Sequence, residues 1–309
     1  MNNKLLKDFD VFSRALVMSN DVDPTYPVIK DILKHKPHYQ PEWFVFVYVA
    51  YYSLESAVQF CDMWPTYEEY KDNTGKFIKL REERRIINKF GHERRGTCRN
   101  PKNQLVLFKA AGDFIKNDLK TLEKASNLDF RVRLESKPWH GGWSAFKIAE
   151  IFEKSLGWEN LKIKDLGLDG RDPNSNDGPI GGLRWIFGRD NKYNQNWFKT
   201  WNRFGSELSK AWDFDIGEVE TCLCKWHKTV SGKYFVGHDI QEFVELKHVL
   251  DKDVYWQIMS GNFDKGFWKG KNTLDKHLKS HYLSKGEILY GDYGKKITPI
   301  SIADIILSL

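Results

Sequence analysis

Two glycine turns, each followed by an apolar helical pattern, constrain the fold of this chain more than any other feature. The first is His140-Gly141-Gly142-Trp143, and apolar residues follow at helical spacing from Ala145 to Leu156. The second is Gly178-Pro179-Ile180-Gly181-Gly182. Glycine at the start of a helix lets the backbone come close to another backbone or to a phosphate. These turns are therefore packing turns or anion-binding turns, and the sequence leaves both alternatives open.

Helical spacing of apolar residues recurs along most of the chain and predicts a mainly α-helical fold. An apolar run from Trp43 to Leu54 predicts a buried helix that begins at Pro41 and continues through Phe60. Residues 128–134 alternate between apolar and polar, and they predict a short strand or an extended lead-in to the first glycine turn. We expect a helical catalytic domain over residues 1–260 and a C-terminal extension packed on it over residues 261–309. Further helices are expected over residues 5–18, 24–33, 104–125, 194–212, 216–230 and 240–250.

The composition indicates a folded protein that is able to bind nucleic acid. Hydrophobic residues make up 41% of the chain and charged residues 29%, which excludes an intrinsically disordered chain. The net charge of +6 permits contact with phosphates, and the 12 tryptophans include candidates for stacking on bases. The apolar run 43–54 is too short to cross a bilayer, no signal peptide precedes it, and the four cysteines show no paired spacing. These features predict a cytoplasmic protein.

A basic stretch near the end of the first third of the chain contains Arg94 and Arg95. It follows a strongly charged segment that runs from Lys76 to His92. A run of this kind is either a solvated face or a loop that contacts DNA phosphates, for which the planar guanidinium of arginine is well suited. Both interpretations remain open.

The predicted helix over residues 216–230 places three polar side chains on one face. Glu220, Cys224 and Lys228 are spaced by four residues each. They are an ordinary surface arrangement, or they set a carboxylate and an ammonium at the edge of a cleft, where the first could act as a base and the second could hold a phosphate. The overlapping Cys222-x-Cys224-x-x-His227 does not have the spacing of a zinc site, so we expect no metal.

Four short motifs together resemble one family. They are Trp43-x-x-Phe46, the stretch from Gly141 to Ala149, the stretch from Gly178 to Arg184 and the stretch from Glu220 to Lys228. This combination resembles the alpha-glutamyl/putrescinyl thymine pyrophosphorylase family, whose phage members include the amino acid:DNA transferases. The resemblance covers most of residues 9–245. The family tends to have Gly-x-Gly in the first turn, and in the second it tends to have Gly-Pro-Gly with paired arginines, where this chain has one nearby arginine, Arg184.

The resemblance implies a helical fold like that of the helix-hairpin-helix DNA glycosylases and a reaction on a thymine already in DNA. A 5-hydroxymethyluracil is first phosphorylated by a separate DNA kinase. The transferase then displaces phosphate or pyrophosphate with the amine of an amino acid or a polyamine, after it flips the base or reaches it through the major groove. It implies no cofactor beyond this co-substrate, and a setting in the cytoplasm of a phage-infected bacterium.

The resemblance also suggests roles for particular residues. An amine that is protonated at neutral pH needs a base, for which Asp177 is the first candidate and Glu220 the second. Arg184, Lys228, Lys225 and Arg14 are candidates to stabilise the departing phosphate. The predicted contacts with the DNA backbone are the amides of the glycine turns and the side chains beside them or in the basic loop: Gly141, Gly142, Gly181, Gly182, His140, Trp143, Arg94 and Arg95.

Two other functions fit the same residues. One is a helix-hairpin-helix DNA glycosylase that acts on a modified pyrimidine. Such enzymes use a single aspartate downstream of the hairpin, and Asp177 lies at a comparable distance along the chain from the first glycine turn. The other is a DNA-binding module without catalytic activity. In that case Asp177 only caps the following helix and Arg184 lies on the surface.

Overall fold

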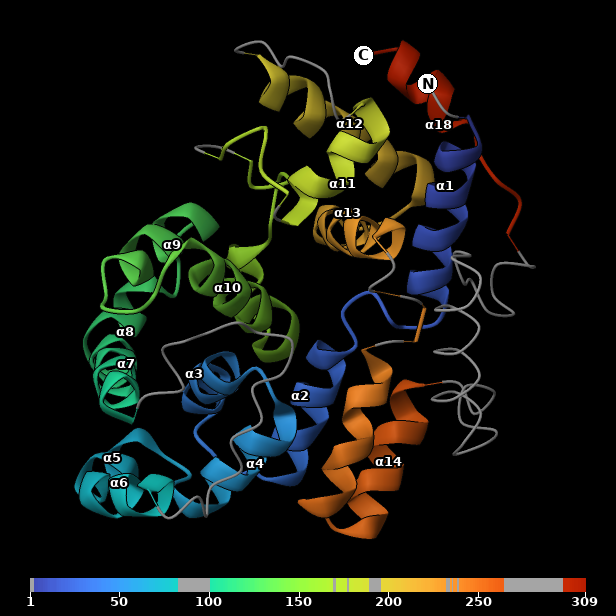
Figure 1. The fold of residues 1–309 in the computed structure, drawn as a ribbon. Coiled ribbons are helices and arrows are strands. Elements are labelled where there is room, and N and C mark those ends of the chain that lie inside the picture. The colour runs from blue at the N-terminus through green and yellow to red at the C-terminus, as the bar shows by residue number, and fades with distance from the viewer. Residues whose placement is uncertain are drawn as a thin grey trace. The chain divides into compact units, whose positions relative to one another are not determined.

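Helices form the regular structure of this protein, as the sequence predicts. The computed structural model describes residues 3–82, 101–168, 171–176, 178–188, 196–231, 234, 236–237, 239–263 and 297–309. Within these ranges no β-strand occurs (Figure 1). The mainly α fold class is therefore confirmed, and the closer likeness to the helix-hairpin-helix glycosylases stays a prediction.

Six helices lie within residues 3–82. They are α1 (Asn3–Met18), α2 (Thr25–His35), α3 (Pro41–Tyr51), α4 (Leu54–Met63), α5 (Tyr67–Asp72) and α6 (Thr74–Glu82). The described chain resumes at Pro101 with α7 (Pro101–Asp113). It continues through a π-helical turn (Phe114–Asp118), α8 (Leu119–Leu122), α9 (Asn127–Glu135), α10 (Gly142–Leu156) and a 3₁₀ turn (Glu159–Leu161). The remaining elements are α11 (Gly178–Phe187), α12 (Trp197–Trp212), α13 (Ile216–Val230), a 3₁₀ helix (Ile240–His248), α14 (Lys252–Asn262) and α18 (Ile302–Leu307).

The chain divides into two compact units, and the first contains residues 1–24, 163–242 and 262–309. Helix α13 is its central element, with α1, α11 and α12 packed against it (Figure 1). The apolar residues Ile216, Val219, Leu223 and Trp226 of α13 are buried, and the Trp226 ring lies 5.4 Å from Phe9 and 5.6 Å from Phe12 of α1, measured between ring centroids. Asp215 begins α13 with a capping box that also uses Glu218. The capping box thus accounts for the start of α13, and the spacing of its apolar residues accounts for its buried face.

A buried carboxylate ties distant parts of the first unit together. Asp10 of α1 accepts hydrogen bonds from the indole of Trp212 at 2.7 Å and from the amide of Ile300 at 3.0 Å. Arg14 pairs with the same carboxylate at 2.7 Å and also donates to the carbonyl of Thr298. Arg14 therefore holds the segment before α18, and a contact between Arg14 and DNA stays a prediction.

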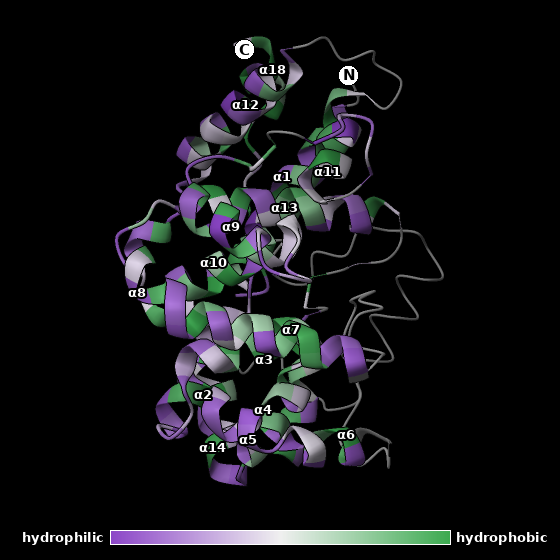
Figure 2. Ribbon diagram, turned by 90° about the vertical axis from the view of Figure 1, so that its left-hand side faces the viewer, coloured by the Kyte–Doolittle hydropathy of each residue, from purple (hydrophilic) through white to green (hydrophobic). Residues whose placement is uncertain are grey.

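The second unit contains residues 25–162 and 243–261. Helix α10 contacts α2, α3 and α9, while α3 also packs against α4 and α7. The ring centroids of Trp43 and Phe108 lie 5.3 Å apart, and Phe60 lies 5.1 Å from Phe108. Every residue of α3 from Trp43 to Tyr51 is buried, which fits a helix that is apolar on all sides. Helix α12 of the first unit differs, and Figure 2 shows both hydrophilic and hydrophobic residues along its ribbon.

Two elements predicted from the sequence are wrong in this unit. The buried helix ends at Tyr51, because Tyr52 adopts a left-handed conformation with φ of 50° and Ser53 caps a new helix, α4. Residues 128–134 form helix α9 and no strand, with Ser126 as its N-cap. The alternating pattern misled the prediction because Phe130 and Leu134, which are buried, share one face in a helix as well as in a strand.

The division of the chain that the sequence analysis placed near residue 260 stays a prediction. Most of residues 261–309 lie outside the described ranges, and the helix at their end, α18, packs on α1 and α12. No helix in the described part of the chain is both long and apolar enough to span a bilayer.

Candidate active site and nucleic-acid interface

Helix α11 packs closely on α13 because two of its residues lack a side chain (Figure 1). A Cβ atom added to Gly182 would lie 2.2 Å from the carbonyl oxygen of Leu223, and one added to Gly181 would lie 2.7 Å from Cγ of His227. Both distances are shorter than non-bonded atoms tolerate. The second glycine turn is therefore a packing turn in this structure, and a contact between Gly181 or Gly182 and DNA stays a prediction.

The start of α11 brings an arginine close to α13. Gly178 has a φ of 54°, which side chains rarely adopt. A Cβ atom at this position would lie 3.0 Å from Nη1 of Arg171 and 3.7 Å from Sγ of Cys224. Arg171 was not among the residues predicted from the sequence, where its one signal is its place in the polar stretch before the second glycine turn. The missing side chain of Gly178 leaves room for this guanidinium.

On α13, Glu220 and Cys224 interact directly, as their spacing predicts. The Glu220 side chain is buried, and the thiol of Cys224 donates a hydrogen bond to its Oε1 at 3.2 Å. Loss of water around the thiol raises the pKa of Cys224 well above its usual value, and the charge of Glu220 adds to this, although Lys228 and Arg171 partly oppose it. The thiol therefore keeps its proton at neutral pH, which makes it a hydrogen-bond donor to Glu220 and a poor nucleophile.

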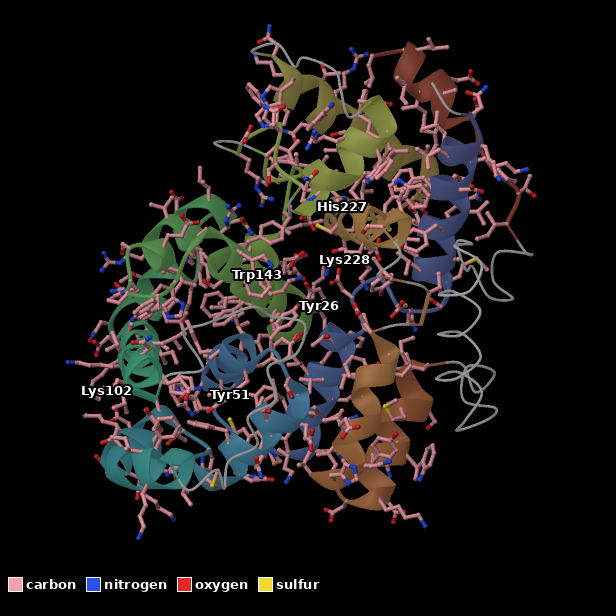
Figure 3. The ribbon with its side chains drawn as sticks, in the orientation of Figure 1. Tyr26, Tyr51, Lys102, Trp143, His227 and Lys228 are labelled. Atoms are coloured by element: carbon pink, nitrogen blue, oxygen red, sulfur yellow. The ribbon has the colours of Figure 1, made fainter. Side chains whose placement is uncertain are left out.

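The next positions of α13 complete this cluster. Lys228 lies one turn after Cys224 and is exposed, and His227 lies beside it with its ring against Gly181 (Figure 3). Residues Arg171, Gly178, Glu220, Cys224 and Lys228 are called the α11–α13 cluster below. The cluster combines one buried carboxylate with two cations, which is a suitable arrangement for proton transfer beside a bound anion.

Arg184 serves the loop that leads into α11. Its Nη1 atom donates to the carbonyl oxygen of Asn174 at 2.6 Å and to Oδ1 of Asn176 at 2.9 Å. These bonds hold residues 174–176 against the helix. Asp177, the first candidate for the catalytic base, follows this loop but lies outside the described residues, as do Arg94 and Arg95. The roles of Asp177, Arg94, Arg95 and Arg184 in chemistry or DNA binding stay predictions.

Lys225 belongs to a separate, buried network. Its Nζ atom lies 2.7 Å from Oδ2 of Asp239 and donates to the carbonyl of Asp21. The carboxylate of Asp21 accepts hydrogen bonds from the hydroxyl of Tyr234 at 2.8 Å and from the amide of Gly237 at 2.7 Å. Lys225 is only 6% exposed. The structure thus gives Lys225 a structural role, and its proposed contact with a phosphate stays a prediction.

In the second unit, α9 and α10 form a helical hairpin around the first glycine turn. The His140 ring is buried beneath the turn, edge-on to Phe46 at 5.4 Å. Gly141, Gly142 and Trp143 are exposed, and the Trp143 ring lies 5.2 Å from Tyr52. Because α10 begins at Gly142, the amides of its first turn have no acceptor within the helix. The turn thus places the first-turn amides of α10 beside the exposed ring of Trp143, which Figure 3 labels.

The carboxylate of Asp118 holds the end of α9 and the turn that follows it. Asp118 pairs with Lys137 at 2.6 Å and accepts a hydrogen bond from Nε of Arg133 at 2.7 Å. Burial raises the pKa of Asp118, but the two cations outweigh burial and hold that pKa below its usual value. Lys137 and Arg133 are therefore anchored, and the glycine turn between α9 and α10 is held in place.

Comparison with known proteins identifies the family. Residues 17–235 match the model of the family described as "Amino acid:DNA transferase". This chain belongs to the amino acid:DNA transferase family. It is therefore a transferase that acts on DNA. No curated protein and no solved structure gives a significant match. The matched residues include the whole α11–α13 cluster and the hairpin of this transferase, whereas Arg14 precedes them.

Alanine substitutions distinguish the two glycine turns of the transferase. The double substitution Gly141→Ala and Gly142→Ala should change the free energy of unfolding by less than about 1 kcal/mol. A Cβ at Gly141 meets no atom within 4 Å, and one at Gly142 meets only the Glu135 carboxylate, at 3.6 Å or more. The affinity for DNA should fall because the added methyl groups keep phosphates away from the amides. Urea denaturation and fluorescence anisotropy with a labelled duplex measure the two effects.

Gly182→Ala is the matched control for this pair. Its methyl group would collide with the backbone of α13, so the free energy of unfolding should fall by about 1–3 kcal/mol or more. If the hairpin variant lost as much stability as Gly182→Ala, its glycines would be packing residues too.

Proposed function

We propose that this transferase joins the amine of an amino acid or a polyamine to the methyl carbon of a thymine in DNA. Its substrate is a 5-phosphomethyl- or 5-pyrophosphomethyl-deoxyuridine that a separate DNA kinase has prepared from 5-hydroxymethyluracil. The family match over residues 17–235 is the observation that carries this proposal. The buried carboxylate and the adjacent cations of the α11–α13 cluster support it, because the reaction needs a base and an anion site.

The reaction balances with groups that this chain supplies. The amine arrives largely as an ammonium, since the pKa of such an amine is roughly 8–10, and it gives up a proton to Asp177 or Glu220. The nitrogen then attacks the methylene carbon attached to C5, and the bond from that carbon to the phosphate oxygen breaks. The phosphate or pyrophosphate departs with the electron pair. In this proposal the amine is a co-substrate, and neither a metal nor an organic cofactor takes part.

The hairpin of the second unit supports binding to a DNA backbone. Its accessible amides suit phosphate oxygens, and Trp143 offers a ring beside them. A protein that modifies a base edge must unstack that base or reach it through the major groove. We propose base flipping on a helix-hairpin-helix glycosylase-like scaffold, within the cytoplasm of a phage-infected bacterium where the kinase and the amine are present.

Mass spectrometry of nucleosides tests the proposal. DNA with 5-phosphomethyl- or 5-pyrophosphomethyl-deoxyuridine is incubated with the protein and a pool of amino acids and polyamines, and then digested to nucleosides. We expect a new nucleoside whose mass shows the gain of an amine and the loss of the phosphate group. Release of a free modified base would show a glycosylase, and bound but unchanged DNA would show a binding module.

Asp177→Asn should abolish most of the turnover and leave the affinity for DNA within a few-fold of the wild-type value. The rate should fall by at least about 100-fold if Asp177 takes the proton from the amine. Single-turnover kinetics and anisotropy on the same substrate measure both quantities. Asp172→Asn is the matched control, because Asp172 is an exposed aspartate of the same loop whose carboxylate accepts hydrogen bonds from Asn174. A parallel loss of stability and DNA binding in Asp177→Asn would instead indicate that Asp177 caps α11.

A further inference from the structure

The turn that leads into the first glycine pair holds a tryptophan in a backbone conformation that suits glycine. The amide of His140 donates to the carbonyl oxygen of Lys137 at 3.2 Å, which closes a four-residue turn. Pro138 occupies the second position of this turn, and Trp139, at the third, has a φ of 67°. A proline followed by a residue with positive φ is the pattern of a type II turn, whose third position favours glycine or asparagine. A bulky side chain is strained there, so the local backbone does not explain why this residue is a tryptophan.

Contacts of the Trp139 side chain within the protein do not explain it either. Trp139 is 50% exposed, and among the described residues its indole forms no hydrogen bond and no ring contact. Other tryptophans of this unit have such contacts. Trp143 is less exposed and its ring packs on Tyr52, while the indole of the buried Trp43 donates to the carbonyl oxygen of Trp64 at 3.2 Å. The indole of Trp139 therefore offers an accessible aromatic surface to a ligand.

The residues that follow Trp139 leave room for a long ligand. A Cβ atom added to Gly141 would meet no atom within 4 Å, and one added to Gly142 would meet only the carboxylate of Glu135. Both glycines are exposed. The Cα atoms of Trp139 and Gly142 are three residues apart along the chain, and hence at most about 11 Å apart in space. The indole thus lies close to the turn for which a contact with the DNA backbone is proposed above.

We propose that Trp139 stacks on a nucleobase of the bound DNA strand. This inference rests on the DNA contact proposed for the hairpin, and it assigns the base contact to Trp139. An indole stacks on any base, because every base has a π-face, so the contact adds affinity without a requirement for sequence. A protein partner would gain less, since the exposed neighbours Pro138, Gly141 and Gly142 provide little apolar side-chain area around the ring. Trp139 is therefore a binding residue for the strand and takes no part in proton transfer.

A cycle of substitutions in the protein and in the DNA tests the inference. Fluorescent single strands carry 5-phosphomethyl-deoxyuridine at the centre, flanked either by bases or by abasic sites that keep the sugar-phosphate backbone. Anisotropy gives Kd for the wild-type protein and for Trp139→Gly. On the strand with bases, Trp139→Gly should bind roughly 5- to 150-fold more weakly than the wild type. On the abasic strand the two proteins should bind alike, because the ring has no base to contact. Strands with one abasic site each then identify the contacted base.

Three further variants separate stacking from a structural role. Trp139→Phe keeps a ring and should retain the difference between the two strands, whereas Trp139→Asn, which tolerates the same φ, should lose it as Trp139→Gly does. The fold should survive in Trp139→Gly, with little change in Tm, because glycine suits this turn. Trp256→Ala is the matched control, since Trp256 is 41% exposed on α14 of the same unit and lies outside the matched residues 17–235, and it should bind like the wild type.

The inference is overturned if Trp139→Gly binds the strand with bases as tightly as the wild type does. It is also overturned if the substitution weakens binding to both strands equally, because the residue would then act on the backbone contact or on the fold. Self-association of the wild type that Trp139→Gly abolishes, without a change in DNA affinity, would make Trp139 a protein contact. The cycle needs neither an amine donor nor turnover. If no amine reacts with DNA, the proposed function fails, whereas the two strands still decide the role of Trp139.

Discussion

Lys225→Met is expected to lower the free energy of unfolding by about 3–5 kcal/mol at neutral pH. The substitution removes the only cation that contacts both Asp239 and Asp21 in the buried network of the described first unit. The buried Asp21 carboxylate would then lie near the partly exposed Asp239 carboxylate without the lysine that offsets both charges. Burial raises the pKa of Asp21 to about 6, and Lys225 is the main group that opposes this rise. Without Lys225 the pKa of Asp21 must rise further.

The loss of unfolding free energy caused by Lys225→Met should be larger at high pH than at low pH. A carboxylate with a folded-state pKa above its unfolded value binds a proton more readily in the folded protein, so it costs stability as pH rises through that folded pKa. Urea denaturation at about pH 8 should therefore show the full loss for Lys225→Met, and at about pH 5 the difference from the wild type should shrink. If the stability difference between Lys225→Met and the wild type were larger at about pH 5 than at about pH 8, the role of Lys225 in this buried network would be contradicted.

Lys228→Met is the matched control on the same helix. Lys228 is exposed and forms no ion pair in the described residues, so its replacement should change the free energy of unfolding by less than about 0.5 kcal/mol. If Lys225 instead bound a phosphate, Lys225→Met would keep its stability and lose DNA affinity. Comparison of Lys225→Met with Lys228→Met therefore distinguishes a structural role of Lys225 from a role in phosphate binding.

Lys225 also shows where prediction from the sequence stops. The bounds of α13 follow from local spacing, which predicted a helix over residues 216–230, and the structure adds the Asp215 cap at its start. The partner of Lys225 at Asp21 lies 204 residues away along the chain. No local pattern connects the two residues, so the sequence could not predict the buried network that holds Lys225. The contact of Arg14 with Thr298 was unpredictable for the same reason, because the two residues lie far apart along the chain.

The two glycine turns show a different limit. Both have adjacent glycines before an apolar helix, and the sequence could not tell packing from binding. What decides between these roles is the atom that would face a Cβ, which is the backbone of Leu223 at Gly182 and no atom within 4 Å at Gly141. That information exists only after α11 and α13 have packed. Arg171 was missed for the same reason, because its position beside Gly178 depends on the turn between them.

Glu220→Gln should reduce kcat by about 100- to 10,000-fold if Glu220 takes the proton from the amine. The amide has the same shape and can still accept a hydrogen bond from the thiol of Cys224, so the fold should survive and the Tm should change little. What the variant lacks is a group that can hold a proton from the donor. The measurement is single-turnover formation of the aminated nucleoside, with DNA and donor both saturating.

The kinetic pattern then distinguishes Glu220 from Asp177. If Asp177 is the base and Glu220 only receives the ammonium, Glu220→Gln should raise KM for the donor and change kcat little, while Asp177→Asn lowers kcat. Cys224→Ala is the control for disturbance of α13, because it removes the hydrogen bond to Glu220 and keeps the carboxylate. An unchanged kcat and an unchanged KM in Glu220→Gln would exclude Glu220 from the reaction and would leave the α11–α13 cluster with no base among the described residues.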